Sequence, residues 1–235
     1  MQQRMNANEM KTVAGRSPGA TVVLSAALGA AAAVFAVSAR AAEPVTYVGA
    51  QFGVNDLNNW PAHVDFGAGV KVDGRQRLGS GNHYGLTVGR QTEKGRFELE
   101  YQRGGMNLRG IELGPVSEAA SGSGHYEAFT VNAYRTRAFN ESVSGYLGVG
   151  IGWGSVSLPR ASFSTGCNCF PAASEGGLAY LARLGAEYRF GEGHHAFLQY
   201  TWLSLPGPSA LGSAPGVEYS RRGIGAVSVG YRKNF

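Results

Sequence analysis

Charged side chains recur at positions of one parity in two otherwise largely apolar stretches of the chain, at residues 96, 98 and 100 and at residues 183, 187 and 189. Successive side chains of a β-strand point to opposite faces, so each stretch predicts a strand with one apolar face and one charged face. Charges of both signs on one face would either line a narrow ion path or neutralise one another as a salt-bridged plug. The residues concerned are Arg96, Glu98, Glu100, Arg183, Glu187, Arg189 and, near the end of the chain, Arg232.

A second candidate for chemistry is the cysteine pair in Thr165-Gly-Cys-Asn-Cys-Phe170. Two thiols are too few for a structural zinc site. Under oxidising conditions Cys167 and Cys169 would instead form a loop disulfide, although a ring with one intervening residue is strained. Soft-metal binding and cross-linking to another chain are the alternatives. No bound cofactor is expected.

The first 41 residues have the pattern of an export signal. Basic residues come first, an uncharged Ala/Val/Leu-rich run follows, and Ala39-Arg40-Ala41 offers small residues at a cleavage site. We interpret residues 1–41 as a cleaved signal peptide, with Met5 or Met10 as possible starts, and residues 42–235 as one domain. A retained N-terminal membrane helix is the alternative, because the run approaches a span of about 20 residues.

The net charge of +5 overstates the basic character of the predicted domain. Four of the 21 Lys and Arg residues and one of the 16 Asp and Glu residues lie in the predicted signal, which leaves 17 basic against 15 acidic residues. No cluster of basic residues remains, so a nucleic-acid partner is not expected.

The region after residue 41 predicts an all-β protein. No apolar stretch reaches the 18 or so residues of a membrane helix, and the chain is rich in Gly (36), Tyr (11) and Phe (11). Period-2 alternation predicts eight strands. They are Val45–Asn55, His83–Gln91, Arg96–Gly104, His125–Phe139, Ser142–Ser157, Gly177–Phe190, His194–Leu205 and Val217–Phe235.

The connections between these strands alternate between short and long. Three are tight turns, and four are long loops, at Asp56–Asn82, Gly105–Gly124, Leu158–Gly176 and Pro206–Gly216. Short periplasmic turns and long extracellular loops are typical of antiparallel transmembrane β-barrels. The sequence therefore predicts an eight-stranded barrel in the outer membrane of a Gram-negative bacterium.

Two segments do not fit simple alternation. Arg135 and Arg137 share parity with the apolar Phe129 and Val131, which predicts a bulge or an early strand end near the following turn. The first long loop holds a further alternating run, Val64–Val72, which could protrude as a hairpin and offer an edge to a partner strand, or could be a solvated loop.

Six stretches in order resemble the OmpA-like family of eight-stranded outer-membrane barrels, which includes porin-family and opacity-type proteins. They are Tyr47–Gly53, Phe97–Tyr101, Tyr146–Gly152, Gly185–Tyr188, Leu198–Trp202 and Val227–Tyr231. The resemblance implies a lumen charge network that includes Glu98 and Glu187. It also implies that the barrel assembly machinery reads the terminal strand, with Tyr231 and Phe235 as its signal. The family can place an arginine where Phe197 stands, so Arg183 would supply the counter-charge.

We expect a structural or adhesin-like role carried by the outer loops, particularly Asp56–Asn82 and Leu158–Gly176. Expected partners are outer-membrane lipids including lipopolysaccharide, and an extracellular ligand. A narrow porin is the alternative and a lipid A-modifying enzyme a remote one. The histidines His83, His125, His194 and His195 show no triad spacing, so we expect them to be polar rim residues and the protein not to be an enzyme.

Overall fold

The computed structural model describes residues 44–92 and 95–235. The predicted signal peptide, residues 1–41, lies outside the described residues. Within these ranges the chain forms twelve β-strands. None of the described segments is a helix long and apolar enough to cross a membrane.

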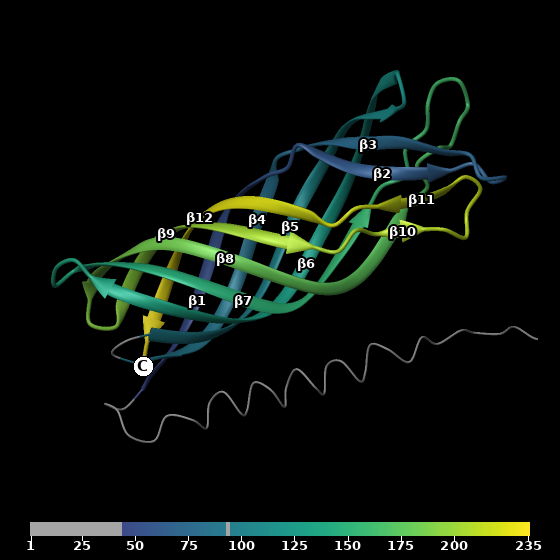
Figure 1. The fold of residues 1–235 in the computed structure, drawn as a ribbon. Coiled ribbons are helices and arrows are strands. Elements are labelled where there is room, and N and C mark those ends of the chain that lie inside the picture. The colour runs from purple at the N-terminus through teal and green to yellow at the C-terminus, as the bar shows by residue number, and fades with distance from the viewer. Residues whose placement is uncertain (1–43, 93–94) are drawn as a thin grey trace, which may run out of the picture. The chain divides into compact units, whose positions relative to one another are not determined.

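Eight of the strands in the described ranges close into an antiparallel ring, which confirms the predicted fold class (Figure 1). The order around the ring is β1-β4-β5-β6-β7-β8-β9-β12 and back to β1. The terminal strands pair with each other, from Tyr47 opposite Asn234 to Asp56 opposite Gly225. The strands of the ring are β1 (Val45–Asp56), β4 (Gly81–Gln91), β5 (Gly95–Leu113), β6 (Val116–Ala138), β7 (Val143–Leu158), β8 (Ala173–Gly191), β9 (His194–Leu205) and β12 (Arg222–Asn234).

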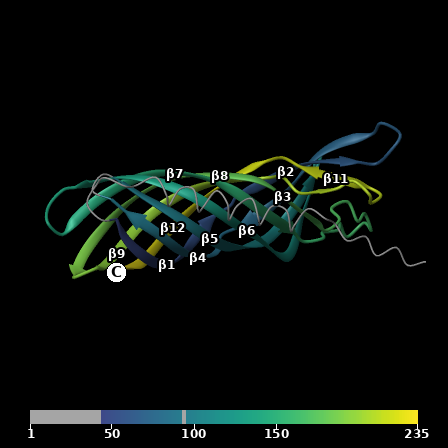
Figure 2. The same ribbon diagram turned by 90° about the horizontal axis from the view of Figure 1, so that it is seen from below.

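The remaining strands extend the sheet at the end of the ring that carries the long connections. They are β2 (Asn59–Asp65), β3 (Lys71–Gly79), β10 (Ser209–Ala210) and β11 (Gly216–Tyr219). In both views β2, β3 and β11 lie at one end and the C-terminus lies at the other (Figures 1 and 2). Short turns at Phe139–Ser142 and Glu192–Gly193 lie at the C-terminal end, which is the periplasmic end in barrels of this type.

The hairpin expected in the first long loop is present, but its edges are not free. The β2–β3 turn contains Gly67, Ala68 and Gly69, all with positive φ, a conformation that glycine adopts without strain. β3 pairs with the outer part of β5, and β2 pairs with β11. The expectation of an open edge for a partner strand was therefore wrong for this hairpin, because other parts of the chain occupy both edges.

The second predicted loop, Gly105–Gly124, is mostly strand. β5 and β6 continue as a hairpin to a turn at Gly114 and Pro115. Small residues such as Gly122 and Ser123 carry little β-propensity, so the pattern weakened where the pairing continued. The last predicted strand is divided instead, into β11 and β12, around Ser220 and Arg221.

The bulge predicted near the end of β6 is absent from the described chain. β6 pairs with β7 in unbroken register from His125 opposite Ser157 to Ala138 opposite Ser144. Arg135 and Arg137 therefore keep the outward parity of Phe129. The register shifts among the described strands lie elsewhere, at Arg77–Leu78 against β5, at Leu108–Gly110 against the outer part of β6 and at Arg189–Gly191 against β9.

The outer wall of the ring is apolar. Leu147 is 64% exposed and Leu86 61%, and a continuous exposed surface of this kind is expected only where lipid covers it. The ring thus spans a membrane. Other outward residues are Val48, Phe52, Val88, Phe97, Val149, Ile151, Trp153, Leu178, Tyr180, Leu184, Tyr188, Leu198, Trp202, Val227, Val229 and Tyr231.

The interior has two zones. Toward the short-turn end the inward side chains are charged or polar. Toward the long-loop end they form an apolar core beneath the extra strands, where Trp60 is fully buried and donates to the carbonyl of Ser220 at 2.7 Å. This core contains Leu57, Trp60, Val64, Leu78, Met106, Leu108, Ile111, Val156, Leu158, Phe163, Phe170, Leu181, Leu203, Leu205, Val217 and Ile224.

Candidate functional site

Inward positions on opposite sides of the ring bring five of the seven predicted charges together in the lumen, where Arg232 of β12 joins them. β5 supplies Arg96, Glu98 and Glu100, and β8 supplies Arg183 and Glu187. Each is at most 5% exposed. Because β6 and β7 separate β5 from β8 around the ring, these side chains meet across the interior rather than along the wall.

The layer nearer the periplasmic end centres on Glu187. Its carboxylate accepts hydrogen bonds from Arg96 at 3.0 Å and Arg232 at 2.6 Å, and lies 2.9 Å from His195 Nδ1. The Arg96 guanidinium also lies 3.2 Å from Glu98. Arg96 and Arg232, with His195 beside them, thus surround the carboxylates of Glu187 and Glu98, so that the buried charges of both signs have partners.

Tyrosines enclose this layer. Tyr47 donates to Glu98 at 2.7 Å, and the Arg96 guanidinium lies 4.1 Å from the ring centre of Tyr146 and 4.6 Å from that of Tyr134. A guanidinium over aromatic faces is stabilised by their quadrupoles without further solvation. The aromatic rings therefore fill space that water would otherwise occupy.

The next layer centres on Glu100, which is fully buried. It accepts hydrogen bonds from Arg183 at 2.7 Å, Gln51 at 2.8 Å and Asn132 at 2.7 Å. Arg183 donates in addition to Thr201 and Tyr134. Both members of the pair have their charge and most of their hydrogen-bonding groups satisfied, as a stable buried ion pair requires.

Above Glu100 the lumen changes from charged to neutral and then to apolar. His83 contacts Gln51 at 3.3 Å and Tyr126 at 3.0 Å. Tyr126 already belongs to the apolar core. The charges are therefore bounded on the extracellular side by a packed hydrophobic layer.

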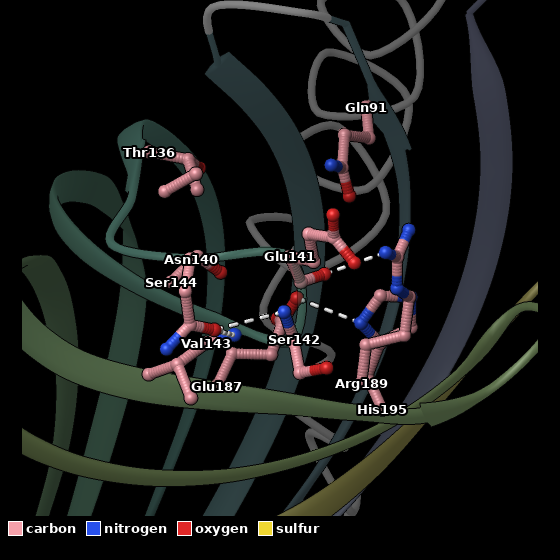
Figure 3. Close-up of a pocket in the computed structure, with 11 residues that line it drawn as sticks. Gln91, Thr136, Asn140, Glu141, Ser142, Val143, Ser144, Glu187, Arg189 and His195 are labelled. Carbon is pink, nitrogen blue, oxygen red and sulfur yellow. Dashed lines mark hydrogen bonds and ion pairs between the residues drawn. The ribbon is translucent and has the colours of Figure 1, made fainter.

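Arg189, the sixth predicted member, lies outside the network. Its side chain is at the periplasmic mouth and donates to the backbone carbonyl of Glu141 at 2.5 Å (Figure 3). The register shift at Arg189–Gly191 ends the regular pairing just there. At this end of β8, the alternation of inward and outward positions therefore no longer predicts which side chains are buried.

The mouth itself is a hollow of about 220 Å³. Glu187 and His195 reach it from the lumen, and Arg189 and Glu141 line it from the rim (Figure 3). It connects the charge network to the periplasmic side without reaching the apolar core.

Of the four histidines expected to be polar rim residues, His83 is fully buried inside the barrel, because it points inward and β4 begins two residues before it, at Gly81. His195 points inward at the start of β9, is 8% exposed and lines the periplasmic mouth. His194, by contrast, contacts Tyr231 and Lys233 near the barrel end. In residues 44–92 and 95–235 no serine or cysteine side chain is hydrogen-bonded to a histidine.

Sequence reasoning missed the neutral members of the network. Tyr47, Gln51, Asn132, Tyr146 and Gln199 all take part. The sequence could have indicated them, since each occupies an inward position of its strand. They were missed because only charged residues were considered as members of the network.

The outer cysteines face each other in the connection between β7 and β8. The structure joins Cys167 to Cys169 as a disulfide, and Cys169 is buried beside the apolar core with Phe163 and Phe170. No group of three or more metal-binding side chains occurs in the part of the chain that is described.

These features define an eight-stranded, membrane-spanning β-barrel with a filled lumen, the architecture of small outer-membrane proteins. No family model matches the sequence, and no curated protein matches it. Solved structures do share the fold. Neisserial surface protein A is 16% identical with a TM-score of 0.50, covering 81% of this chain and 97% of that one.

A second solved structure gives the same result. The outer membrane protein OprG from Pseudomonas aeruginosa is 14% identical with a TM-score of 0.55, covering 82% of this chain and 96% of that one. At these identities the likeness establishes the fold. Together with the apolar wall, it gives this chain the fold of the eight-stranded outer-membrane β-barrel proteins.

Proposed function

We propose that the chain is a sealed, OmpA-like barrel with a structural or surface-interaction role carried by its extracellular end. One observation carries the proposal: the lumen is filled by the Arg183–Glu100 layer and by the apolar core above it. Eight strands enclose barely enough room for side chains. A solute path would have to break a fully buried ion pair and then cross a hydrophobic layer.

The extracellular extension supports a contact role. Polar pairs lie on its surface: His63 and Asp73 share a hydrogen bond of 2.7 Å, and Glu112 forms ion pairs with both Arg75 and Arg77. A hollow of about 430 Å³ lies among Pro61, His63, Asp73, Arg75 and Glu112. Because β2 and β3 are held by β5 and β11, this surface is rigid enough to present fixed contacts to an extracellular ligand.

The proposed role is non-catalytic. Its support is that no serine or cysteine side chain of the described residues is hydrogen-bonded to a histidine, since acyl transfer of the triad type requires that contact. The further proposals stay as the sequence predicts them: residues 1–41 act as a cleaved signal, the barrel assembly machinery inserts the barrel, and the wall binds outer-membrane lipids including lipopolysaccharide.

A narrow channel is the second candidate. It is favoured by polar atoms of Gln102 and Thr130 that are buried without a protein partner among the described residues. Water usually satisfies such groups. The part of the lumen between the ion-pair layer and the apolar core can therefore hold some solvent.

Conductance in a planar lipid bilayer separates the two candidates. Protein purified from outer membranes, with its fold checked by faster migration of the unboiled sample, is expected to give no conductance steps. Reproducible steps that change when Arg183 is replaced would overturn the sealed barrel in favour of a narrow porin.

A further inference from the structure

Two arginines stand on the lipid-facing wall without a protein counter-charge. Arg135 and Arg137 point outward from β6 and are exposed, and neither forms an ion pair with another described residue. A bare arginine on the lipid face of a barrel is unfavourable, increasingly so with depth. An anion from outside the chain would offset their charge.

Two other outward arginines of the barrel do have protein partners. Arg103, nearer the extracellular end, donates to Glu127 on the neighbouring strand at 2.6 Å. Arg221 lies 5.4 Å from the ring centre of Tyr180 and donates to the carbonyl of Leu178. The Arg135–Arg137 pair is thus not a general property of this wall but a local exception.

The two arginines border a groove. A hollow of about 770 Å³ is lined by Arg135, Arg137, Phe139, Gly145, Leu147 and Leu184. A second hollow of about 510 Å³ shares Arg135 and Leu147 and continues to Ala133 and Val149, further from the turn. The groove therefore has a cationic end near the periplasmic turn and an apolar run toward the middle of the membrane.

Small residues make the groove. Gly145 stands at an outward position of β7, two residues from Leu147, and leaves no side chain of its own on the wall there. The ring of Phe139 lies over it, 2.9 Å from where a Cβ would be. Ala133 continues the shallow floor on β6. Leu147, Val149 and Leu184 beside these small residues offer an apolar surface to an acyl chain.

We propose that this groove over β6, β7 and β8 binds an anionic glycerophospholipid of the periplasmic leaflet. Its phosphate would be held by the guanidinium groups of Arg135 and Arg137, which suit bidentate phosphate contacts, and an acyl chain would lie along Leu147 and Val149. The position near the Phe139–Ser142 turn selects the leaflet, since lipopolysaccharide occupies the opposite one.

The groove also selects the headgroup charge. No acidic side chain lines either hollow within the described residues, so the ammonium of a zwitterionic headgroup would find no partner. Each arginine near a membrane surface contributes on the order of 1 kcal/mol toward an anionic lipid. For two arginines this corresponds to a preference of about 30-fold for phosphatidylglycerol over phosphatidylethanolamine.

Native mass spectrometry of the full protein in detergent, titrated separately with each phospholipid, tests the proposal. The wild type is expected to bind one phosphatidylglycerol preferentially, and R135Q/R137Q to lose the preference. A matched control, R103Q/E127Q, removes the charged pair nearer the extracellular end and should leave binding unchanged. Equal binding by wild type and R135Q/R137Q would overturn the proposal.

A second variant distinguishes loss of lipid binding from loss of folding. Leu147→Trp fills the shared part of the groove without changing charge, and is expected to weaken both phospholipids while keeping the heat-dependent gel shift of a folded barrel. If L147W binds like the wild type, or if lipopolysaccharide competes for the phosphatidylglycerol site, the assigned groove is wrong. Neither outcome depends on whether the lumen conducts.

Discussion

Glu100 illustrates how this protein keeps charges away from both lipid and water. Its carboxylate is fully buried and is met by one guanidinium and two amides. Removal of one partner from such a group leaves the other charge uncompensated, whereas removal of both charges is often neutral. The distinction gives a test of the network at single residues.

Replacement of Arg183 by Met is expected to lower the free energy of unfolding by about 3–5 kcal/mol, because Glu100 remains buried without its cation. The measurement is urea unfolding in lipid vesicles followed by tryptophan fluorescence. The double variant R183M/E100Q should recover most of the loss. Arg189→Met, at the exposed mouth, serves as the control, and an equal loss there would contradict the assignment of Arg183 to a buried pair.

At the scale of elements, the wall depends on glycines where adjacent strands approach closely. A Cβ at Gly152 on β7 would meet the Phe129 carbonyl oxygen and the Thr130 Cα of β6. Backbone atoms cannot rotate away as a side chain can, so the β6–β7 pair would have to separate locally. Gly105 on β5, by contrast, has nothing within 4 Å of an added Cβ.

Gly152→Ala is therefore expected to cost about 1–3 kcal/mol through overpacking, measured by the same unfolding experiment. Gly105→Ala is the matched control and should be neutral or slightly stabilising, since alanine loses less backbone entropy than glycine in a strand. A neutral result for Gly152→Ala would mean that β6 and β7 are not held at the spacing the register requires.

For the whole molecule, the segregation of short and long connections predicts its orientation in the outer membrane. The β2–β3 turn, with Val70 54% exposed, should face outward, and Ser142 in the β6–β7 turn should face the periplasm. Both positions allow a cysteine probe in a background where Cys167 and Cys169 are serine.

A membrane-impermeant maleimide is expected to label Val70→Cys on intact cells, but Ser142→Cys only after the outer membrane is permeabilised. Labelling would be read by mass shift of the purified protein. The reverse pattern would invert the barrel and move the proposed phospholipid groove to the outer leaflet.

The sequence by itself determined the fold class and the wall. Alternation of Leu147, Val149 and Ile151 with glycine is a local, period-2 signal, and it needs only the geometry of one strand to be read. For the same reason parity placed Arg96, Glu98 and Glu187 on the inner face. Parity did not single out the neutral partners, Tyr47 and Gln199 among them, because an uncharged inward side chain does not by itself indicate membership of a charge network.

Only the tertiary structure decided which inward residues meet. Arg183 reaches Glu100 across a ring whose width depends on strand number and stagger together, and no local pattern carries that information. The outer strands have the same origin: β2, β3 and β11 have weak patterns of their own and are ordered by pairing with one another and with β5. Likewise, the outward position of Arg135 and Arg137 followed from the unbroken β6–β7 register, where local alternation had predicted a bulge.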